Sequence, residues 1–266
     1  FRSVAMFRSL NIAATGMSAQ QTQLDGIAHN IANANTVGFK RQRTEFQDLL
    51  YQTIRAPGAP TGPTTMSPTG LQLGTGVRVV GTSRTFEQGT LYNTQGPLDL
   101  AIEGNGFFVV QQADGNPAYT RAGNLKTDGD GRIVTSEGLP LDPPITVPPG
   151  AAGISISANG TVSAIMAGEK APVDLGQISV ATFVNPAGLR ALGHNLFIPS
   201  AASGEPQVGE AGQDGRGALL QGSLEQANVD IVEEMIGLIS AQRGYEVNSK
   251  VITAADEMLR AATQMK

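Results

Sequence analysis

Side chains suited to metal binding are few and lie far apart in the sequence. The chain has no cysteine and two histidines, His29 and His194. Because protein zinc sites gather Cys and His ligands at short spacings, two isolated histidines argue against one. Asp128, Asp130 and Glu137 have the residue types of a calcium loop. They lack the full ligand set of such a loop, so we interpret them as part of a β-turn and predict no metal site.

Motifs for catalysis or cofactor binding are also missing. The sequence has no G-x-S-x-G nucleophile elbow and no phosphate loop that ends in Gly-Lys-Ser/Thr. Gly104-Asn105-Gly106 lacks the third glycine of a dinucleotide fingerprint, and we interpret it as a tight turn before a strand. Paired carboxylates for glycoside cleavage would meet only in three dimensions, and nothing in the sequence favours them. We therefore predict that the chain is not an enzyme and has no catalytic residues and no cofactor.

A small basic cluster, Lys40, Arg41 and Arg43, precedes Glu45 and Asp48. Two interpretations stay open. The cations either lie on a solvated face or near a helix C-terminus, where the helix dipole favours positive charge, or they form ion pairs with a neighbouring subunit.

Charge and hydropathy exclude two classes of partner. The 266 residues include 18 basic and 23 acidic side chains, a net charge of −5, whereas nucleic-acid proteins usually have a basic excess. No apolar run is long enough to span a bilayer, so we expect no membrane insertion. The residues up to Leu10 lack the apolar core of a secretory signal. Two interpretations of the start stay open: Phe1 to Ala5 belong to the protein, or they are an extension before Met6.

Proline and glycine divide the chain into two ends and a middle. All 15 prolines lie between Pro57 and Pro206, and few of the 33 glycines lie near the ends. Because these residues break helices and mark turns, the ends are free to form long helices and the middle is cut into short pieces.

Both ends show a seven-residue repeat of apolar residues, which indicates helices that pack in a coiled-coil manner. Two amphipathic helices on the surface of a globular protein would give the same spacing. The amide-rich polar residues of the N-terminal end, among which Asp25 is the only formal charge between Ser9 and Asn35, favour a helix packed on most sides. The predicted seam residues for subunit assembly are Leu10, Met17, Leu24, Ile27, Ile31, Ile231, Leu238, Tyr245, Ile252 and Leu259.

The middle of the chain predicts strands. Alternating apolar residues occur near 77–81, 98–102 and 178–184, and Asn159-Gly160 is a strong hairpin signal. The Pro/Gly/Thr-rich segment 56–70 indicates a linker or an extended arm. We therefore predict an α+β fold with a mainly-β domain inserted between helical ends. The predicted domains are 6–36 with 226–266 (helical), 37–75 (connecting arm) and 76–225 (β-rich).

Two segments at opposite ends resemble a known family. NIANANTVGFKRQR (30–43) and LEQANVDIVEEMIGLISAQRGYEVNSKVITAADEML (224–259) are similar to the N- and C-terminal signatures of the bacterial flagellar rod and hook axial proteins. Internal pieces, such as 119–135, also match. The matching signature positions are Asn30, Asn33, Thr36, Gly38, Phe39, Lys40, Arg41, Asn228, Gln242, Arg243 and Asn248.

The resemblance implies a structural subunit of the flagellar basal body. Such a subunit polymerises helically into a hollow drive shaft, which carries torque to the hook and passes exported axial proteins. It leaves the cell by type III export without a cleaved signal and lies in the rod that crosses the periplasm. The implied partners are further copies of the chain, other rod proteins, the hook protein, and the ring proteins of the peptidoglycan layer and outer membrane.

An arm after the Gly-Phe-Lys motif and the overall length resemble the distal-rod members of the family. A proximal rod or hook subunit is the alternative within the family, and a secreted β-rich adhesin or binding module is the alternative from another class. We expect the arm to lie across a neighbouring subunit and to stiffen the wall through an apolar patch of Phe46, Leu49, Leu50, Tyr51 and Ile54.

Overall fold

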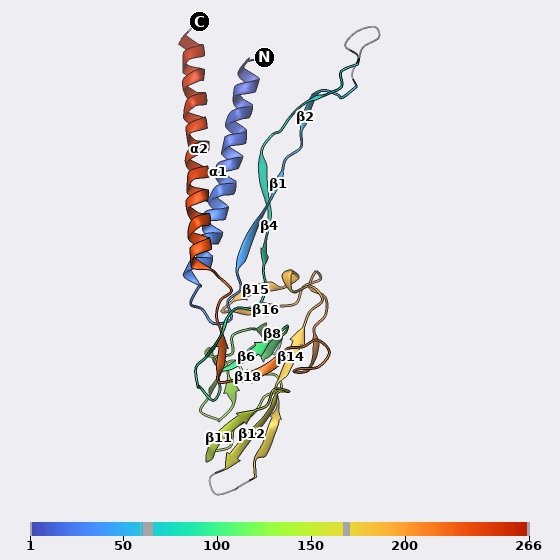
Figure 1. Cartoon of the computed structure of the whole chain (residues 1–266), viewed down its shortest axis with the longest axis vertical. Helices are drawn as coiled ribbons and strands as arrows, with labels where there is room; N and C mark the ends of the chain where they lie inside the picture. The colour runs from blue at the N-terminus through green and yellow to red at the C-terminus, as the bar shows by residue number, and fades with distance from the viewer. Residues whose placement is uncertain (1, 59, 61–65, 167–170, 265–266) are drawn as a thin grey trace. The chain divides into compact units, whose positions relative to one another are not determined.

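The computed structural model describes residues 2–58, 60, 66–166 and 171–264, and the chain divides into two compact units (Figure 1). The helical unit comprises residues 1–31, 42–83 and 231–266. The β unit comprises residues 32–41 and 84–230. Terminal helices with a mainly-β insertion confirm the predicted α+β class.

Two long helices, α1 (Arg2–Ala32) and α2 (Ile231–Gln264), lie side by side in the helical unit (Figure 1). Glycines let them approach closely. A Cβ at Gly16 would lie 3.0 Å from the amide nitrogen of Asn248, and one at Gly244 would lie 3.2 Å from the side chain of Gln20. Ala241 and Ala255 are buried on the α2 side of this seam. Small residues on both helices therefore bring α1 and α2 into contact within one chain.

A two-stranded ribbon completes the helical unit. Strand β1 (Gln42–Asp48) pairs with β4 (Val77–Arg84), and β2 (Gln52–Arg55) pairs antiparallel with β3 (Leu71–Leu73). The strand predicted near 77–81 is thus confirmed as β4. The arm residues on either side of the 56–70 segment are paired strands rather than an irregular linker.

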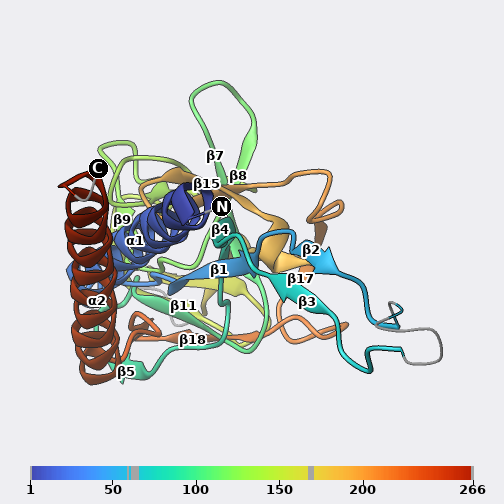
Figure 2. The ribbon, with the colours of Figure 1, turned by 90° about the horizontal axis from the view of Figure 1, so that it is seen from above.

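The ribbon packs on a different side of α1 from α2, so α1 lies between them (Figure 2). The side chain of Asn30 donates to the backbone oxygen of Gln42 at 2.8 Å and accepts from its nitrogen at 2.9 Å. Nearer the N-terminus, a Cβ at Gly76 would collide with the hydroxyl of Thr15. Four residues of α1 are buried: Ala13, Ala19, Ile27 and Asn30. Within the chain α1 thus has contacts on two of its sides, and packing on most sides stays a prediction for the assembled protein.

The β unit is built around a six-stranded sheet whose strands come from distant parts of the sequence. Its order is β15-β16-β8-β7-β14-β17, with antiparallel neighbours throughout. The apolar run at the centre buries Phe107, Phe108, Val109 and Val110. The bounds are β7 (Phe107–Gln111), β8 (Pro117–Thr120), β14 (Ser179–Thr182), β15 (Arg190–Gly193), β16 (Leu196–Ile198) and β17 (Gln207–Glu210).

Smaller sheets surround it. One core cluster joins Leu100, Phe108, Val162 and Ile178, and a second gathers phenylalanines, including Phe107, in edge-to-face contact. The remaining elements are a three-stranded sheet of β11 (Ala151–Ile156), β12 (Thr161–Met166) and β13 (Val173–Gln177), the pairs β6 (Leu100–Glu103) with β18 (Ala218–Gln221), β5 (Leu91–Asn93) with β19 (Ser223–Glu225) and β9 (Lys126–Thr127) with β10 (Ile133–Val134), and the short 3₁₀ helix η1 (Pro186–Gly188).

The predicted turns are confirmed. Gly160 has φ +93°, and its nitrogen donates to Ser157 at 2.9 Å where β11 turns into β12. Gly104 and Gly106, at φ +110° and +142°, form the tight turn before β7. The carboxylate of Asp128 accepts backbone hydrogens of the turn that follows it. Local turn chemistry therefore explains the residues that resembled a nucleotide or calcium loop.

The two units divide the chain differently from the predicted domains. Residues 42–83 lie with the helices because the ribbon strands pair with one another and pack on α1. Residues 32–36 and 226–230, expected in the helical part, lie in the β unit. There Gln226 N donates to the backbone oxygen of Thr90, and the Asn228 side chain donates to those of Thr85 and Glu87.

Gly123 tests the close backbone packing of the β unit. A Cβ there would lie 1.7 Å from the backbone oxygen of Leu100, so Gly123→Ala must displace main chain. We expect it to lower the free energy of unfolding by about 1–3 kcal/mol in chemical denaturation followed by circular dichroism. Gly129→Ala is the matched control, because a Cβ at that turn residue meets nothing within 4 Å. Equal stability of the two variants would contradict the packing described.

Candidate functional site

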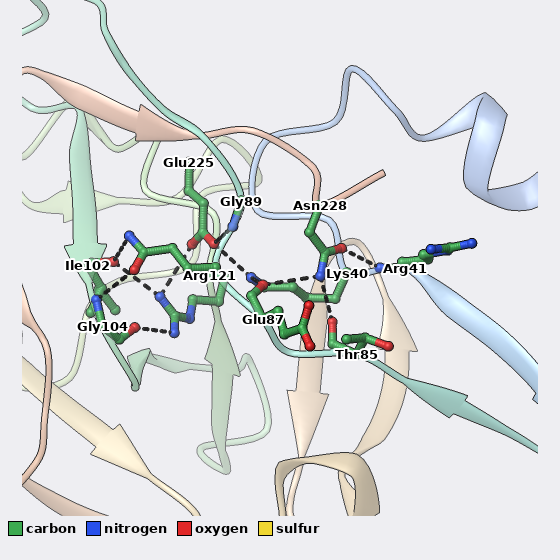
Figure 3. A network of polar contacts seen from close by, with 11 residues as sticks. Lys40, Arg41, Thr85, Glu87, Gly89, Ile102, Gly104, Arg121, Glu225 and Asn228 are labelled. Carbon is green, nitrogen blue, oxygen red and sulfur yellow. Dashed lines mark hydrogen bonds and ion pairs between the residues drawn. The ribbon is translucent and has the colours of Figure 1, made fainter. Parts of the chain in front are cut away.

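Lys40 is fully buried in the β unit, and this corrects both interpretations for this member of the basic cluster, whereas Arg41 is half-buried and Arg43 is exposed. Its Nζ donates to Glu225 Oε1 at 2.7 Å and to the backbone oxygen of Glu87 at 2.7 Å (Figure 3). The cation is therefore neither solvated nor available to another subunit, because a carboxylate of its own chain occupies it. This pair was not predictable from neighbouring residues, since the partners are 185 positions apart.

Glu225 receives bonds from three directions (Figure 3). Besides Lys40, the nitrogen of Gly89 donates to Oε1 at 2.8 Å, and Arg121 Nη1 donates to Oε2 at 3.3 Å. Arg121 is itself buried and holds the backbone oxygens of Ile102 and Gly104 at 3.2 and 2.6 Å. One carboxylate thus connects the N-terminal signature to β6, β8 and the segment after β4.

Two cations share this one buried carboxylate. For both cations the loss of hydration on burial has a larger effect on the pKa than the attraction of the carboxylate. Burial lowers the pKa of Lys40, and the neighbouring Glu225 carboxylate opposes that shift. Burial likewise lowers the pKa of Arg121, again with Glu225 acting in the opposite direction. The backbone carbonyls of Glu87, Ile102 and Gly104 accept further hydrogens from the two cations, whereas Arg121 Nε is buried without a hydrogen-bond partner. A buried cluster of this kind contributes little net free energy when intact, but losing one partner leaves an uncompensated charge.

Asn228 forms a second junction beside this cluster (Figure 3). Its Oδ1 accepts from the nitrogen of Arg41 at 2.7 Å, and its Nδ2 donates to the backbone oxygens of Thr85 and Glu87 at 2.8 and 3.1 Å. Gly38 N also donates to the backbone oxygen of Glu225 at 2.9 Å. The two segments that resembled family signatures therefore meet in space and bind each other.

The other signature residues have local roles that differ between the units. Gly38 has φ +70°, and a Cβ there would lie 2.6 Å from backbone of Arg121 and Ala122, so glycine is required. Phe39 is buried, and Thr36 donates to the side chain of Asn33 at 3.2 Å. In the helical unit, Asn30 holds Gln42, Asn248 contacts Gly16, and Gln242 and Arg243 are exposed.

The predicted seam residues are unequally buried. In α1, Ile27 is buried and lies against Gly237 of α2, and the other predicted seam residues are half-buried. In α2, Leu238, Ile252 and Leu259 are half-buried, whereas Ile231 and Tyr245 are 46% and 41% exposed and lie at the margin of the intrachain seam.

Helix α2 also has a second apolar face, which the seven-residue repeat did not reveal. Its side chains are large, apolar and exposed, and at about 100° per residue they lie on the side of the helix away from the seam. An exposed apolar face of this size indicates a binding surface. It comprises Val232, Met235, Ile236 and Ile239, and we call it the outer face of α2. Val247, Val251 and Met258 are exposed as well but lie closer to the seam.

The arm residues are mostly exposed as well. Leu50, Tyr51 and Ile54 are 90%, 56% and 57% exposed, Phe46 is 41% exposed, and Leu49 is half-buried. Apolar side chains on so thin a ribbon have no core of their own to enter.

The histidines and acidic residues considered as metal ligands do not come together at one site. His29 is exposed on α1, while His194 lies at φ +54° in the turn between β15 and β16 and contacts Glu137. Among the described residues, no group of three Asp, Glu or His side chains is placed to hold a metal ion. Within the same part of the chain, no helix is both long and apolar enough to cross a membrane.

Comparison with known proteins agrees with these features. Residues 10–40 match a family model described as flagella basal body rod protein, residues 101–164 match the flagellar hook protein FlgE/F/G D1 domain, and residues 220–265 match the flagellar basal body rod FlgEFG protein C-terminal region. The chain is 49% identical to the flagellar basal-body rod protein FlgG of Caulobacter vibrioides over 97% of its length and 99% of that protein. It is 46% and 42% identical to the FlgG proteins of Buchnera aphidicola and Bacillus subtilis, covering 98% of this chain and 100% of each relative.

The chain belongs to the flagellar rod and hook protein family. Within the family match, each ionised member of the buried cluster comes from a different segment. Lys40 ends the first matched region, Arg121 lies in the second and Glu225 lies in the third. The cluster therefore joins all three family regions inside the β unit.

Removing one charge of the cluster should be costly. We expect Lys40→Met and Glu225→Gln each to lower the free energy of unfolding by about 3–5 kcal/mol, because each leaves buried charge uncompensated. Chemical denaturation measures the loss. Arg132→Ala, which breaks an exposed pair with Asp128, is the control and should leave stability unchanged within error. Wild-type stability of Lys40→Met would contradict the account.

Proposed function

We propose that the chain is the structural subunit of the bacterial flagellar distal rod, and that copies of it polymerise helically into a hollow drive shaft. The observation that carries this is likeness over essentially the whole chain to flagellar basal-body rod proteins named FlgG. Such a shaft transmits torque to the hook and lets exported axial proteins pass through its channel.

The helical unit supplies the surfaces for polymerisation. In the α1–α2 seam the two helices of one chain bury each other's side chains, so contacts between copies must use the surfaces of the helical unit that remain exposed. The outer face of α2 is the largest of these among the exposed apolar side chains of the described helices. We assign the inner tube to the helices and the outer layer to the β unit, with the predicted seam margin at Ile231 and Tyr245 also buried between copies.

The ribbon supplies a second surface. Its exposed apolar residues, centred on Leu50, Tyr51 and Ile54, gain burial only against another molecule. We propose that the ribbon lies across a neighbouring copy and stiffens the wall, as its position in the sequence suggested. This contact would distinguish a distal rod from a proximal rod or hook subunit, the alternative within the family.

Location and partners follow from the same assignment. The subunit would lie in the rod that crosses the periplasm, be exported without a cleaved signal, and contact other rod proteins, the hook protein and the surrounding ring proteins. It would not act as an enzyme. An adhesin or binding module remains the alternative from another class, and a stable monomer that binds glycans would favour it.

Negative-stain electron microscopy of the concentrated protein, together with sedimentation, tests the proposal. We expect helical tubes or rods that grow with protein concentration. Particles that stay monomeric at every concentration, with no incorporation into rods when the chain is supplied to cells that lack their own rod protein, would contradict it.

The outer face of α2 makes a sharper prediction. Ile236→Glu and Ile239→Glu should leave the monomer as stable as wild type, because both side chains are already exposed, yet stop polymerisation. Each isoleucine buried between copies would contribute about 1.5–3 kcal/mol. Ser249→Glu places the same charge at an exposed position of α2 ten residues beyond Ile239, nearly three turns further along the helix, and serves as the control. Normal polymers from both isoleucine variants would exclude this face as an interface.

The ribbon can be tested separately. Deleting residues 46–65, or replacing Leu50, Tyr51 and Ile54 together by serine, should leave a folded β unit and give bent or unstable rods. Circular dichroism checks the fold, and electron microscopy checks the rod. Straight rods of normal stability from both variants would show that the ribbon does not stiffen the wall.

A further inference from the structure

The chain passes between the two units four times, at residues 31/32, 41/42, 83/84 and 230/231. Next to three of these crossings, on the side of the β unit, lie Arg41, Thr85 and Asn228, and these three residues form one ring of hydrogen bonds. Thr85 N donates to the oxygen of Arg41 at 3.0 Å, Arg41 N donates to Asn228 Oδ1 at 2.7 Å, and Asn228 Nδ2 donates to the oxygen of Thr85 at 2.8 Å. The ring ties together the segments that lead to both ribbon strands and to α2.

The fourth crossing is tied to the same place. The segment that follows α1 runs to Gly38, whose nitrogen donates to Glu225 O, and to Lys40, whose ammonium bonds the Glu225 carboxylate and Glu87 O. Arg121 then fastens Glu225 to β6. All four crossing segments are therefore cross-linked inside the β unit, within a few residues of where each leaves it.

We propose that Asn228, with the Lys40–Glu225 pair behind it, is a mechanical clamp. Force that enters the β unit through one crossing segment is shared by all four, and no segment can be peeled away alone. Bonds loaded together must break together, whereas bonds loaded one after another fail in sequence. The proposal rests on the proposed function insofar as a rod subunit carries load, but the clamp itself is a property of the single chain.

The residue type at position 228 fits this role. An asparagine side chain has one acceptor oxygen and two donor hydrogens, and here it accepts from one backbone nitrogen and donates to two backbone oxygens. Alanine would remove all three bonds. Aspartate would keep the bond from Arg41 but would turn a carboxylate oxygen toward the carbonyls of Thr85 and Glu87.

Single-molecule force spectroscopy on the full chain separates a clamp from an ordinary stabilising contact. Because the chain has no cysteine, pairs of introduced cysteines attach handles at chosen points. Handles at Asn35 and Ile231 load the crossing segments directly. Handles at the exposed turn residues Ala113 and Ala158 load the same unit away from the clamp.

We expect Asn228→Ala to shorten the lifetime of the β unit at constant force by about tenfold or more when the crossing segments are pulled. With handles at 113 and 158 the lifetime should stay within about twofold of wild type. Asn185→Ala, which removes a single side-chain bond to the oxygen of Ala202 elsewhere in the unit, is the matched control and should leave the crossing lifetime unchanged. Asn228→Asp should behave like Asn228→Ala.

Three results would overturn the clamp. They are an unchanged lifetime of Asn228→Ala under crossing load, an equal shortening in both pulling directions, and an equal effect of Asn185→Ala under crossing load. The first result would show that Asn228 has no mechanical role. Either of the other two would show that Asn228 contributes only to the general stability of the β unit. Since the measurement uses single chains, a failure here leaves polymerisation intact, and failed polymerisation leaves this result interpretable.

Discussion

The Glu225 carboxylate is the interaction on which the rest of the structure depends. It is buried, accepts hydrogens from Lys40, Arg121 and the backbone of Gly89, and so holds three distant parts of the chain at one point. Burying these charges has a large desolvation cost, which is visible in the lowered pKa values of both cations. A hydrophobic cluster of similar volume could fill the space, but it would not select one partner for each charge. We infer that the fitted geometry of the cluster favours one path of the chain through the β unit.

That geometry separates two tasks. The β unit has a large core of its own and needs no partner to be stable, whereas the helical unit is a pair of helices and a thin ribbon with apolar side chains left exposed. A helix pair of this kind gains from further burial, because most helical stability in proteins comes from packing. Assembly through the helical unit and load bearing through the β unit are thus properties of different residues, joined where the chain crosses between them.

Local patterns made much of the fold predictable. The lack of proline at both ends indicated the helices, and Asn159-Gly160 identified the hairpin, because each depends on neighbouring residues only. The burial of Lys40 was not predictable, since its partner is far away in the sequence and a lysine beside arginines usually indicates a solvent-exposed segment. The seven-residue repeat also concealed the outer face of α2, because a search at spacing seven follows one stripe of a helix and passes over a second.

The central claim is that copies of this chain join through the outer face of α2 while the Lys40–Glu225 cluster stays inside each copy. A reconstruction of isolated basal bodies by electron cryo-microscopy, at a resolution that shows side chains, tests it most directly. The account predicts Ile236 and Ile239 buried against a neighbouring copy and Lys40 bonded to Glu225 of its own chain. A rod in which the outer face of α2 meets only water, or in which Lys40 pairs with another copy, would contradict it.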